Sequence, residues 1–225
     1  MLCDLHIHTA LSPCADDDMT PNNIIGMSVL NGLSVVAITD HNSCRNVRAC
    51  REIGQKHGIY VIPGMELTTQ EEIHIVCLFP DVSDAEAFSA AVYDALPPIV
   101  NKPRVFGNQL VYDGRDVVTA HEERLLITAT RIPVTEVVAL VAARRGICYP
   151  AHIDREANGI LSILGDIHPE LRFAACEFSP RADEAVRARY AHLTPVTASD
   201  AHALGDIADE TTAIPLPAFL QPLLS

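Results

Sequence analysis

Short apolar runs alternate with longer stretches of helical periodicity along much of the chain. Strands that are buried in a parallel sheet consist of such runs, and the helices between them repeat about every 3.6 residues. The alternation therefore predicts an α/β fold with parallel strands, arranged as an open sheet or a closed barrel. The predicted strands are Leu2–His8, Ser34–Thr39, Tyr60–Pro63, Ile73–Phe79, Gly146–Ala151, Phe173–Phe178 and Pro195–Ser199. The predicted helices are Pro21–Asn31, Val47–His57, Ala85–Ala95, Pro133–Arg144 and Ala182–His192.

The regular alternation is interrupted near the middle of the chain, after Pro97 and Pro98. Proline ends regular structure because its ring fixes φ and removes a backbone donor. Further on, the turn Tyr112-Asp-Gly114 between apolar stretches predicts a small hairpin. We interpret residues 97–132 as an excursion from a single domain that spans residues 1–225, a length that suits one core.

Composition and charge narrow the partners that the chain can bind. Apolar residues make up 48% and charged residues 20%, as in an ordinary globular protein. The 29 acidic and 16 basic residues give a net charge of −13, and no run of lysine and arginine occurs. This charge repels a long nucleic acid, whereas cations bound in a pocket would still attract a small phosphorylated molecule. The oligomeric state is left open.

The seven cysteines form no C-x-x-C pair and stand mostly in apolar runs, which is typical of reduced thiols in the cytoplasm. No apolar segment approaches the roughly 18 residues of a membrane span, and the first residues do not resemble a signal peptide. We therefore expect a cytoplasmic protein with no membrane partner.

Histidine and acidic residues gather at the ends of the predicted strands. His6 and His8 stand two residues apart, so both imidazoles point to the same side of a strand. A parallel α/β fold brings such strand ends to one rim, and we expect the residues to meet there as metal ligands. Nitrogen and oxygen ligands without sulfur favour zinc, manganese or iron. The candidate ligands are His6, His8, His41, Glu66, His74, His152, Asp200 and His202.

These residues lie in six motifs, which together resemble the PHP (polymerase and histidinol phosphatase) phosphoesterases. The motifs are Asp4-Leu-His6-Ile-His8-Thr9, Thr39-Asp40-His41, Gly64-Met-Glu66, His74-Ile-Val, Ala151-His152 and Ser199-Asp200-Ala-His202. The resemblance implies a distorted (β/α)7 barrel with two or three divalent ions in a cleft at the C-terminal ends of the strands. The implied ligands are His6, His8, Glu66 and Asp200 for the first ion, Glu66, His74 and His152 for the second, and His41, His202 and one loop residue for the third.

The loop ligand is the least determined part of this site. The loop after the first strand reads Ser12-Pro-Cys-Ala-Asp16-Asp17-Asp18-Met-Thr20-Pro21. Counting back from the Thr-Pro pair, as in similar proteins, selects Asp16. Cys14 and Asp17 remain alternatives, and a solvated acidic loop tip would equally explain the aspartates.

The resemblance implies a hydrolase of phosphate esters that works through a hydroxide bridging the metal ions. Its substrate would be a small phosphomonoester, as for a histidinol phosphatase, or a nucleotide phosphate, as for a nucleotide phosphatase or an exonuclease. Asp40 is predicted to orient an imidazole or relay a proton, and Arg155 to bind the phosphate. The alternative is a metal-binding PHP module with a regulatory or interaction role and little catalysis.

Overall fold

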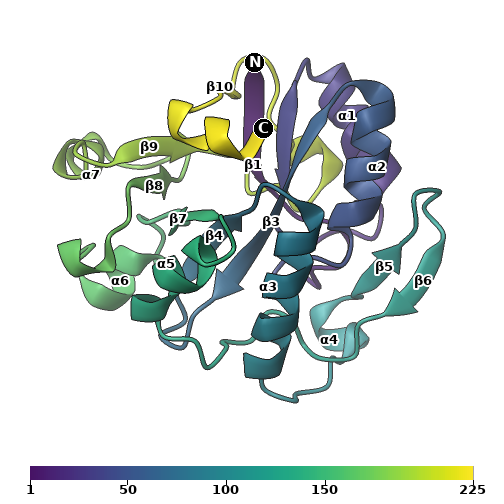
Figure 1. The fold of residues 1–225 in the computed structure, drawn as a ribbon, viewed down its shortest axis with the longest axis horizontal. Coiled ribbons are helices and arrows are strands. Elements are labelled where there is room, and N and C mark those ends of the chain that lie inside the picture. The colour runs from purple at the N-terminus through teal and green to yellow at the C-terminus, as the bar shows by residue number, and fades with distance from the viewer. Residues whose placement is uncertain (225) are drawn as a thin grey trace.

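The computed structural model describes residues 1–224, which form a curled sheet with helices around it (Figure 1). The strands are β1 (Leu2–Ile7), β2 (Val35–Ile38), β3 (Tyr60–Thr68), β4 (His74–Leu78), β5 (Leu110–Tyr112), β6 (Val118–His121), β7 (Ile147–Pro150), β8 (Ala175–Phe178), β9 (Thr194–Thr197) and β10 (Ile214–Pro215). The α-helices are α1 (Pro21–Leu30), α2 (Val47–His57), α3 (Val82–Ala95), α4 (Pro103–Phe106), α5 (Val134–Ala142), α6 (Ile160–Leu164) and α7 (Glu184–Arg189). Three short 3₁₀ helices are η1 (Pro169–Leu171), η2 (Leu204–Asp206) and η3 (Ala218–Leu224).

The sheet curls back towards its first strand. Six strands are hydrogen-bonded in the order β10-β1-β2-β3-β4-β7, and β8 and β9 form a parallel pair. The backbone N–H of Ile153, after β7, donates to the carbonyl of Glu177 in β8 at 2.8 Å. Beyond β9, Ala201 forms a parallel bridge with Ile7 of β1. The predicted α/β architecture is confirmed, while the exact repeat of seven units stays a prediction.

Two strands of the sheet correct the expectation of parallel strands throughout, and one of them is β10, which runs antiparallel to β1. β4 runs antiparallel to both β3 and β7, because only residues 69–73 connect β3 to β4 and a parallel crossover needs a dozen or more residues. β3 is also longer than the predicted Tyr60–Pro63. The reversal brings the first residue of β4, His74, to the rim where the other strands end.

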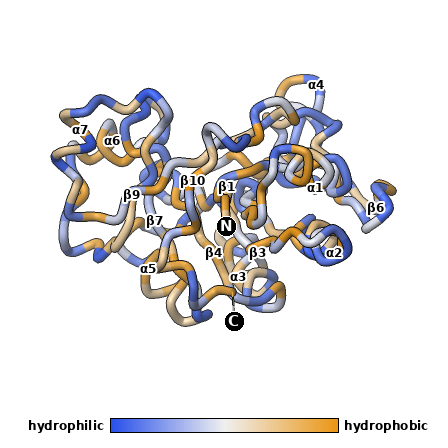
Figure 2. The backbone as a smooth tube through the Cα atoms, turned by 90° about the horizontal axis from the view of Figure 1, so that it is seen from above, coloured by the Kyte–Doolittle hydropathy of each residue, from blue (hydrophilic) through white to orange (hydrophobic). Residues whose placement is uncertain are grey.

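Local signals explain why the well-predicted helices begin and end where they do. The Thr20 side chain caps α1 by accepting a hydrogen bond from the backbone N–H of Asn23, and Pro21 follows at the first helical position. α2 ends at Gly58, whose φ of +75° favours glycine. Hydrophobic positions lie in the central strands, whereas α2 exposes a hydrophilic face (Figure 2). α6 and the 3₁₀ helices were not predicted, because they are too short to show a period.

The excursion predicted at residues 97–132 contains α4 and the antiparallel β5–β6 hairpin. In Figure 1 this hairpin lies at the opposite end of the molecule from α7. The excursion packs on the loop between β1 and α1: the backbone N–H of Leu110 donates to Ala10, and the hydroxyl of Tyr112 donates to the carbonyl of Asp17. Within residues 1–224, no helix has the length and apolar character needed to cross a membrane.

Candidate metal centre

Two histidines at the end of β1 direct their Nε2 atoms towards each other. The Nδ1 of His6 lies 3.0 Å from a carboxylate oxygen of Glu177, and the Nδ1 of His8 lies 2.9 Å from the hydroxyl of Ser12. Because Ser12 donates its own proton to Asp40, its oxygen accepts the proton of His8 Nδ1. A neutral imidazole that carries its proton on Nδ1 offers a lone pair at Nε2, and the two Nε2 atoms lie 3.2 Å apart. Facing lone pairs repel each other unless a cation or a proton stands between them.

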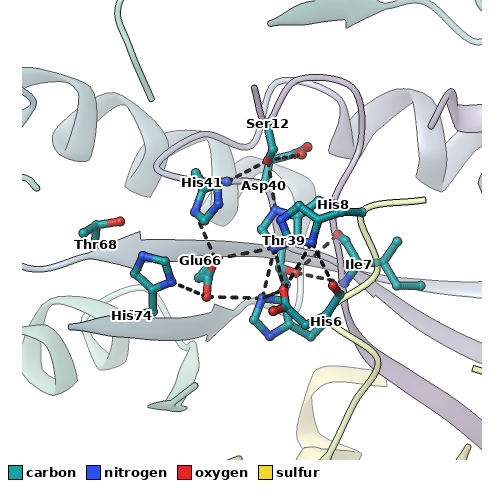
Figure 3. A network of polar contacts seen from close by, with 12 residues as sticks. His6, Ile7, His8, Ser12, Thr39, Asp40, His41, Glu66, Thr68 and His74 are labelled. Atoms are coloured by element: carbon teal, nitrogen blue, oxygen red, sulfur yellow. Dashed lines mark hydrogen bonds and ion pairs between the residues drawn. The ribbon is translucent and has the colours of Figure 1, made fainter. Parts of the chain in front are cut away.

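Glu66 of β3 lies at the centre of the histidine cluster, as Figure 3 shows. Its oxygens lie 2.9 Å from His41, 2.8 Å from His74, 3.1 Å from His152, 3.4 Å from His6 and 3.5 Å from His8. The cluster contains three groups of residues that could each hold an ion. Within a group, the possible ligand atoms all lie within 4.8 Å of one another. The groups are His6, His8, Glu66 and Asp200; His41, Glu66 and His74; and His8, His41 and His202. The first group contains all four residues that were expected to hold one ion.

The charges of the cluster also suit a cation. Burial opposes the charge of His6, but the carboxylates of Glu177 and Asp200 outweigh this and hold its pKa well above the ordinary value. For His8, burial and the neighbouring imidazoles lower the pKa well below that value. Burial likewise opposes the charge of Glu66, yet the imidazoles around it hold its pKa well below the usual range. The protein therefore maintains buried negative charge at a point where several nitrogen atoms converge.

Three buried atoms of the cluster make no hydrogen bond within the described residues: His152 Nδ1, and the pair His41 Nδ1 and Glu66 Oε2, which lie 2.9 Å apart as an ion pair. Buried polar atoms are normally paired, so unpaired atoms in one cluster need an explanation. Divalent ions that prefer nitrogen and oxygen ligands would supply it. The residues present therefore fit a metal centre.

Two residues at the rim have backbone conformations that are uncommon outside glycine. The φ angles of His152 and Asp200 are +27° and +52°. Such conformations cost about 1–3 kcal/mol each and persist where the surrounding structure holds them, often at functional sites. At Asp200 the backbone turn lets the carboxylate reach His8 Nε2 at 3.1 Å.

Asp40 is fully buried behind the metal-type residues, and its carboxylate supports the loop after β1. It accepts hydrogen bonds from the backbone N–H and hydroxyl of Thr9, both at 2.7 Å, and from the hydroxyl of Ser12 at 2.8 Å. Burial raises the pKa of Asp40 to about 6, although these hydrogen bonds oppose the rise. Through Ser12 the carboxylate is linked to His8 Nδ1, and the role predicted for Asp40 stays a prediction.

A cleft of about 150 Å³ opens beside the cluster. Arg155 lies at its edge with 41% of the side chain exposed, and its guanidinium donates to Asp200 at 2.5 Å. The acid next to it in sequence, Asp154, instead accepts hydrogen bonds from Ser179. The residues that line the cleft are His41, Glu66, His74, His152, Arg155, Ala157, Asn158, Asp200 and His202.

The loop after β1 places its candidate ligands differently from the expected order. Asp16 is exposed, and none of the three groups in residues 1–224 includes it. The Asp17 side chain accepts a hydrogen bond from Asn108 of the excursion at 2.7 Å. The thiol of Cys14, in contrast, hydrogen-bonds to His202 and His41.

Sequence reasoning missed Glu177, a buried acid within the apolar strand β8. It contacts His6 Nδ1 and accepts a hydrogen bond from the backbone N–H of His152 at 3.3 Å. It also missed Asp4, which accepts from the backbone N–H groups of Ser199 and Ala208 and so holds the segment before Asp200. A single acid inside an apolar strand was the available signal in both cases.

A family model of the PHP domain matches residues 4–207, which is most of the chain. The chain belongs to the PHP domain family. This family membership agrees with the six motifs. The clustered histidines and carboxylates described above are therefore groups able to bind metal in a PHP fold.

The 5′-3′ exoribonuclease Rnm of Salmonella typhimurium is similar to part of this PHP chain. The two are 35% identical over 88 residues, which cover 37% of this chain and 29% of the exoribonuclease. The matched segments span less than half of each of the curated relatives. Sequence similarity therefore does not transfer an entire protein's activity to this chain.

Two solved structures share the PHP fold over nearly all of the chain. A protein from Bifidobacterium adolescentis, assigned as a metal-dependent phosphoesterase, has a TM-score of 0.60 at 17% identity, with 93% of each chain covered. The lesion-specific endonuclease EndoQ of Pyrococcus furiosus has a TM-score of 0.63 at 16% identity, covering 93% of this chain and 50% of its own. Relatives named as nucleases conflict with the expectation, from charge alone, that long nucleic acid is excluded as a partner.

Proposed function

We propose that this PHP domain, spanning residues 1–225, is a cytoplasmic hydrolase that releases phosphate from a small phosphomonoester or a nucleotide. The observation that carries the proposal is the pair of Nε2 atoms of His6 and His8, which face each other at 3.2 Å with Glu66 and Asp200 beside them. Such a set of ligands is assembled for a divalent ion. The ligands lie next to a cleft that is lined in part by Arg155. A guanidinium in this position can bind the phosphate of a substrate.

The ligands divide between a buried part and an open part of the cleft. His6, His8, Glu66 and Asp200 would hold one ion, Glu66 with His74 and His41 or His152 a second, and His41 with His202 a third. Zinc, manganese and iron all suit nitrogen and oxygen ligands of this kind. When bound, divalent ions polarise a phosphoryl oxygen and lower the pKa of water near neutral pH.

The protein's own groups would then orient the substrate. One end of the Arg155 guanidinium is fixed on Asp200, and its remaining N–H groups can donate to phosphate oxygens at the cleft edge. Asp40, through Ser12, keeps the proton of His8 on Nδ1 and its lone pair on Nε2. We therefore assign Arg155 to substrate binding and Asp40 to positioning.

The size of the cleft and the charge of the chain favour a small substrate over a long nucleic acid. The cleft holds about 150 Å³, and the chain has a net charge of −13. A nucleic acid would have to approach against this charge, because no run of lysine and arginine is present. A short nucleotide end remains compatible with the cleft, in keeping with the names of the nuclease relatives.

The alternative, a metal-binding module without catalysis, is disfavoured by the completeness of the site. A module that has lost catalysis would be expected to lack ligands, yet each of the six motifs contributes at least one ligand-type residue to the cluster or to the cleft beside it. Both functions predict bound metal. Only the phosphoesterase predicts turnover.

The test measures the metal content of the purified protein by elemental analysis, and then phosphate release with added Mn²⁺. The substrates are a panel of phosphomonoesters, 3′,5′-bisphosphates and short oligonucleotides. We expect two or three ions per chain and faster turnover of the small substrates than of the oligonucleotides. Bound metal without turnover of any substrate would support the module instead.

Paired variants show whether the activity belongs to this site. His8→Ala removes one of the two facing lone pairs and should abolish phosphate release. His57→Ala changes an exposed histidine at the end of α2. None of the three groups in residues 1–224 includes His57, so this variant should leave the activity unchanged.

A further inference from the structure

The loop after β1 carries a cysteine that differs from the other six. Cys14 is the exposed one among the seven free cysteines, and the others are buried. Its thiol hydrogen-bonds to His202 and His41. The thiol therefore contacts two of the three residues in the group formed by His8, His41 and His202, although the group of atoms within 4.8 Å does not itself include the sulfur.

The two imidazoles that face this thiol have nitrogen atoms that could bind an ion. His41 is 5% exposed, and its Nδ1 has no hydrogen-bond partner among residues 1–224. The Nδ1 of His202 lies 2.8 Å from the carbonyl of Asp200, so it carries the proton and Nε2 is left as a lone pair. Nitrogen atoms of both residues lie within 4.8 Å of each other and of His8. The convergence of three imidazole nitrogens beside the sulfur, with His41 Nδ1 buried and making no hydrogen bond although it lies 2.9 Å from Glu66, is independent evidence for a bound ion.

We propose that Cys14, and not Asp16, is the loop ligand beside His41 and His202, and that its thiolate makes this position selective for a soft divalent ion such as zinc. The inference rests on the proposed metal-dependent function and adds the chemical identity of one ligand. Sulfur with two imidazoles is a typical zinc set, whereas the two groups around Glu66 offer nitrogen and oxygen. On binding, the thiol proton passes to solvent and the S⁻ lone pair forms the bond to the ion.

The aspartates of the loop are directed elsewhere. The Asp17 carboxylate is engaged by Asn108. Asp16 lies close to the site through its backbone, because its N–H donates to the carbonyl of His202 at 2.9 Å, while the residue itself is exposed. The backbone bond fixes the loop so that Cys14, two residues earlier, meets the imidazoles.

Cobalt provides a readout of this ligand that does not depend on enzyme activity. Co²⁺ takes the place of zinc in such sites, and a thiolate bound to it gives an intense charge-transfer absorption in the near ultraviolet. We expect this band when Co²⁺ is added to the metal-free protein. It should be absent in Cys14→Ser and retained in Asp16→Asn. Persistence of the band in Cys14→Ser, or cobalt binding without the band in the unaltered protein, overturns the proposal.

Alkylation gives a second, independent measurement. With iodoacetamide and peptide mass spectrometry, we expect Cys14 to react in the metal-free protein while the six buried cysteines do not. Zn²⁺ should slow the reaction of Cys14 at least about tenfold, because a metal-bound thiolate is no longer a free nucleophile. An unchanged rate with zinc bound would contradict the assignment.

The results also separate this inference from the proposed function. A protein that shows the cobalt band and the zinc protection, but releases no phosphate, retains Cys14 as a ligand and loses the phosphoesterase assignment. A protein that releases phosphate with Mn²⁺, but lacks both signals, does the reverse. Cys14→Asp replaces sulfur by oxygen and should reduce the preference of this position for Zn²⁺ over Mn²⁺.

Discussion

The two sides of the metal cleft are built in different ways. On the inner side, His6, His8 and Glu66 project from strands, and their side chains have at most 1% of their surface exposed. On the outer side, Cys14 comes from a loop and is exposed, and the His202 side chain is 30% exposed. The inner ligands are fixed by a sheet, whereas the outer ligands depend on how the loop is held.

The supporting contacts differ in the same way. Glu177 and Ser12 fix the imidazoles of His6 and His8 from behind, so the inner side is rigid before an ion binds. The outer side is held by backbone contacts of the loop and by the excursion that packs on it. A strand-borne site therefore supplies the catalytic geometry, and a loop-borne position can change its ligand without disturbing the strands.

The largest effect is expected from Glu66→Gln, because this carboxylate contacts five imidazoles and belongs to two of the three groups. The amide keeps the shape but removes the charge that offsets the ions. Phosphate release should fall about 10³-fold, since bound ions supply several kcal/mol of stabilisation, and elemental analysis should show lost metal. The control is Glu122→Gln. Glu122 is a buried carboxylate of the excursion and forms an ion pair with Arg45, away from the cluster of possible metal ligands. Full metal content with activity within tenfold of the original would contradict this role.

A smaller effect is expected from Glu177→Gln, which alters the support of the inner side without removing a ligand. Groups that orient metal-binding histidines typically change metal affinity or activity by about 10–100-fold. We expect this loss in the dissociation constant for Zn²⁺ or Mn²⁺, measured by competition with a chelating dye. A purely structural role predicts a lower melting temperature with unchanged metal affinity, and that result would remove Glu177 from the site.

The inner side could be predicted from the sequence because strand geometry fixes where side chains point. The i, i+2 spacing of His6 and His8 sets both on one face, and a parallel α/β fold gathers strand ends. His74 was also identified, although it begins a strand where the other ligands end one. It reaches the rim because β4 is antiparallel, and the short connection of residues 69–73 was not used to predict this reversal.

Glu177 and the outer side could not be predicted in the same way. A lone acid in an apolar strand gives no spacing from which its partner, His6, 171 residues away, can be inferred. In the loop after β1, counting residues selected Asp16, but the conformation depends on contacts with the excursion, such as those of Asn108 and Tyr112. Loop geometry set by distant segments has no periodic signal in the sequence.

The smallest effect, and the sharpest test of the difference between the two sides, is expected from Gly107→Ala. Gly107 follows α4 in the excursion with a φ of +101°, and a Cβ at this position would lie 1.9 Å from the carbonyl oxygen of Pro13, next to Cys14. The loop must shift, so the Co²⁺ charge-transfer band should weaken and Co²⁺ should bind the outer position several-fold less tightly, while the metal content of the inner side stays unchanged.

Gly165→Ala is the matched control for this variant. Gly165 has a φ of +78°, but a Cβ there would meet nothing within 4 Å, so the substitution introduces backbone strain of roughly 1 kcal/mol without moving the loop. Cobalt titrations of both variants, alongside their melting temperatures, separate the two causes. If Gly165→Ala weakened the cobalt band as much as Gly107→Ala, general destabilisation would explain the effect. A loss of inner-side metal in Gly107→Ala would show instead that the loop and the strands act as one unit.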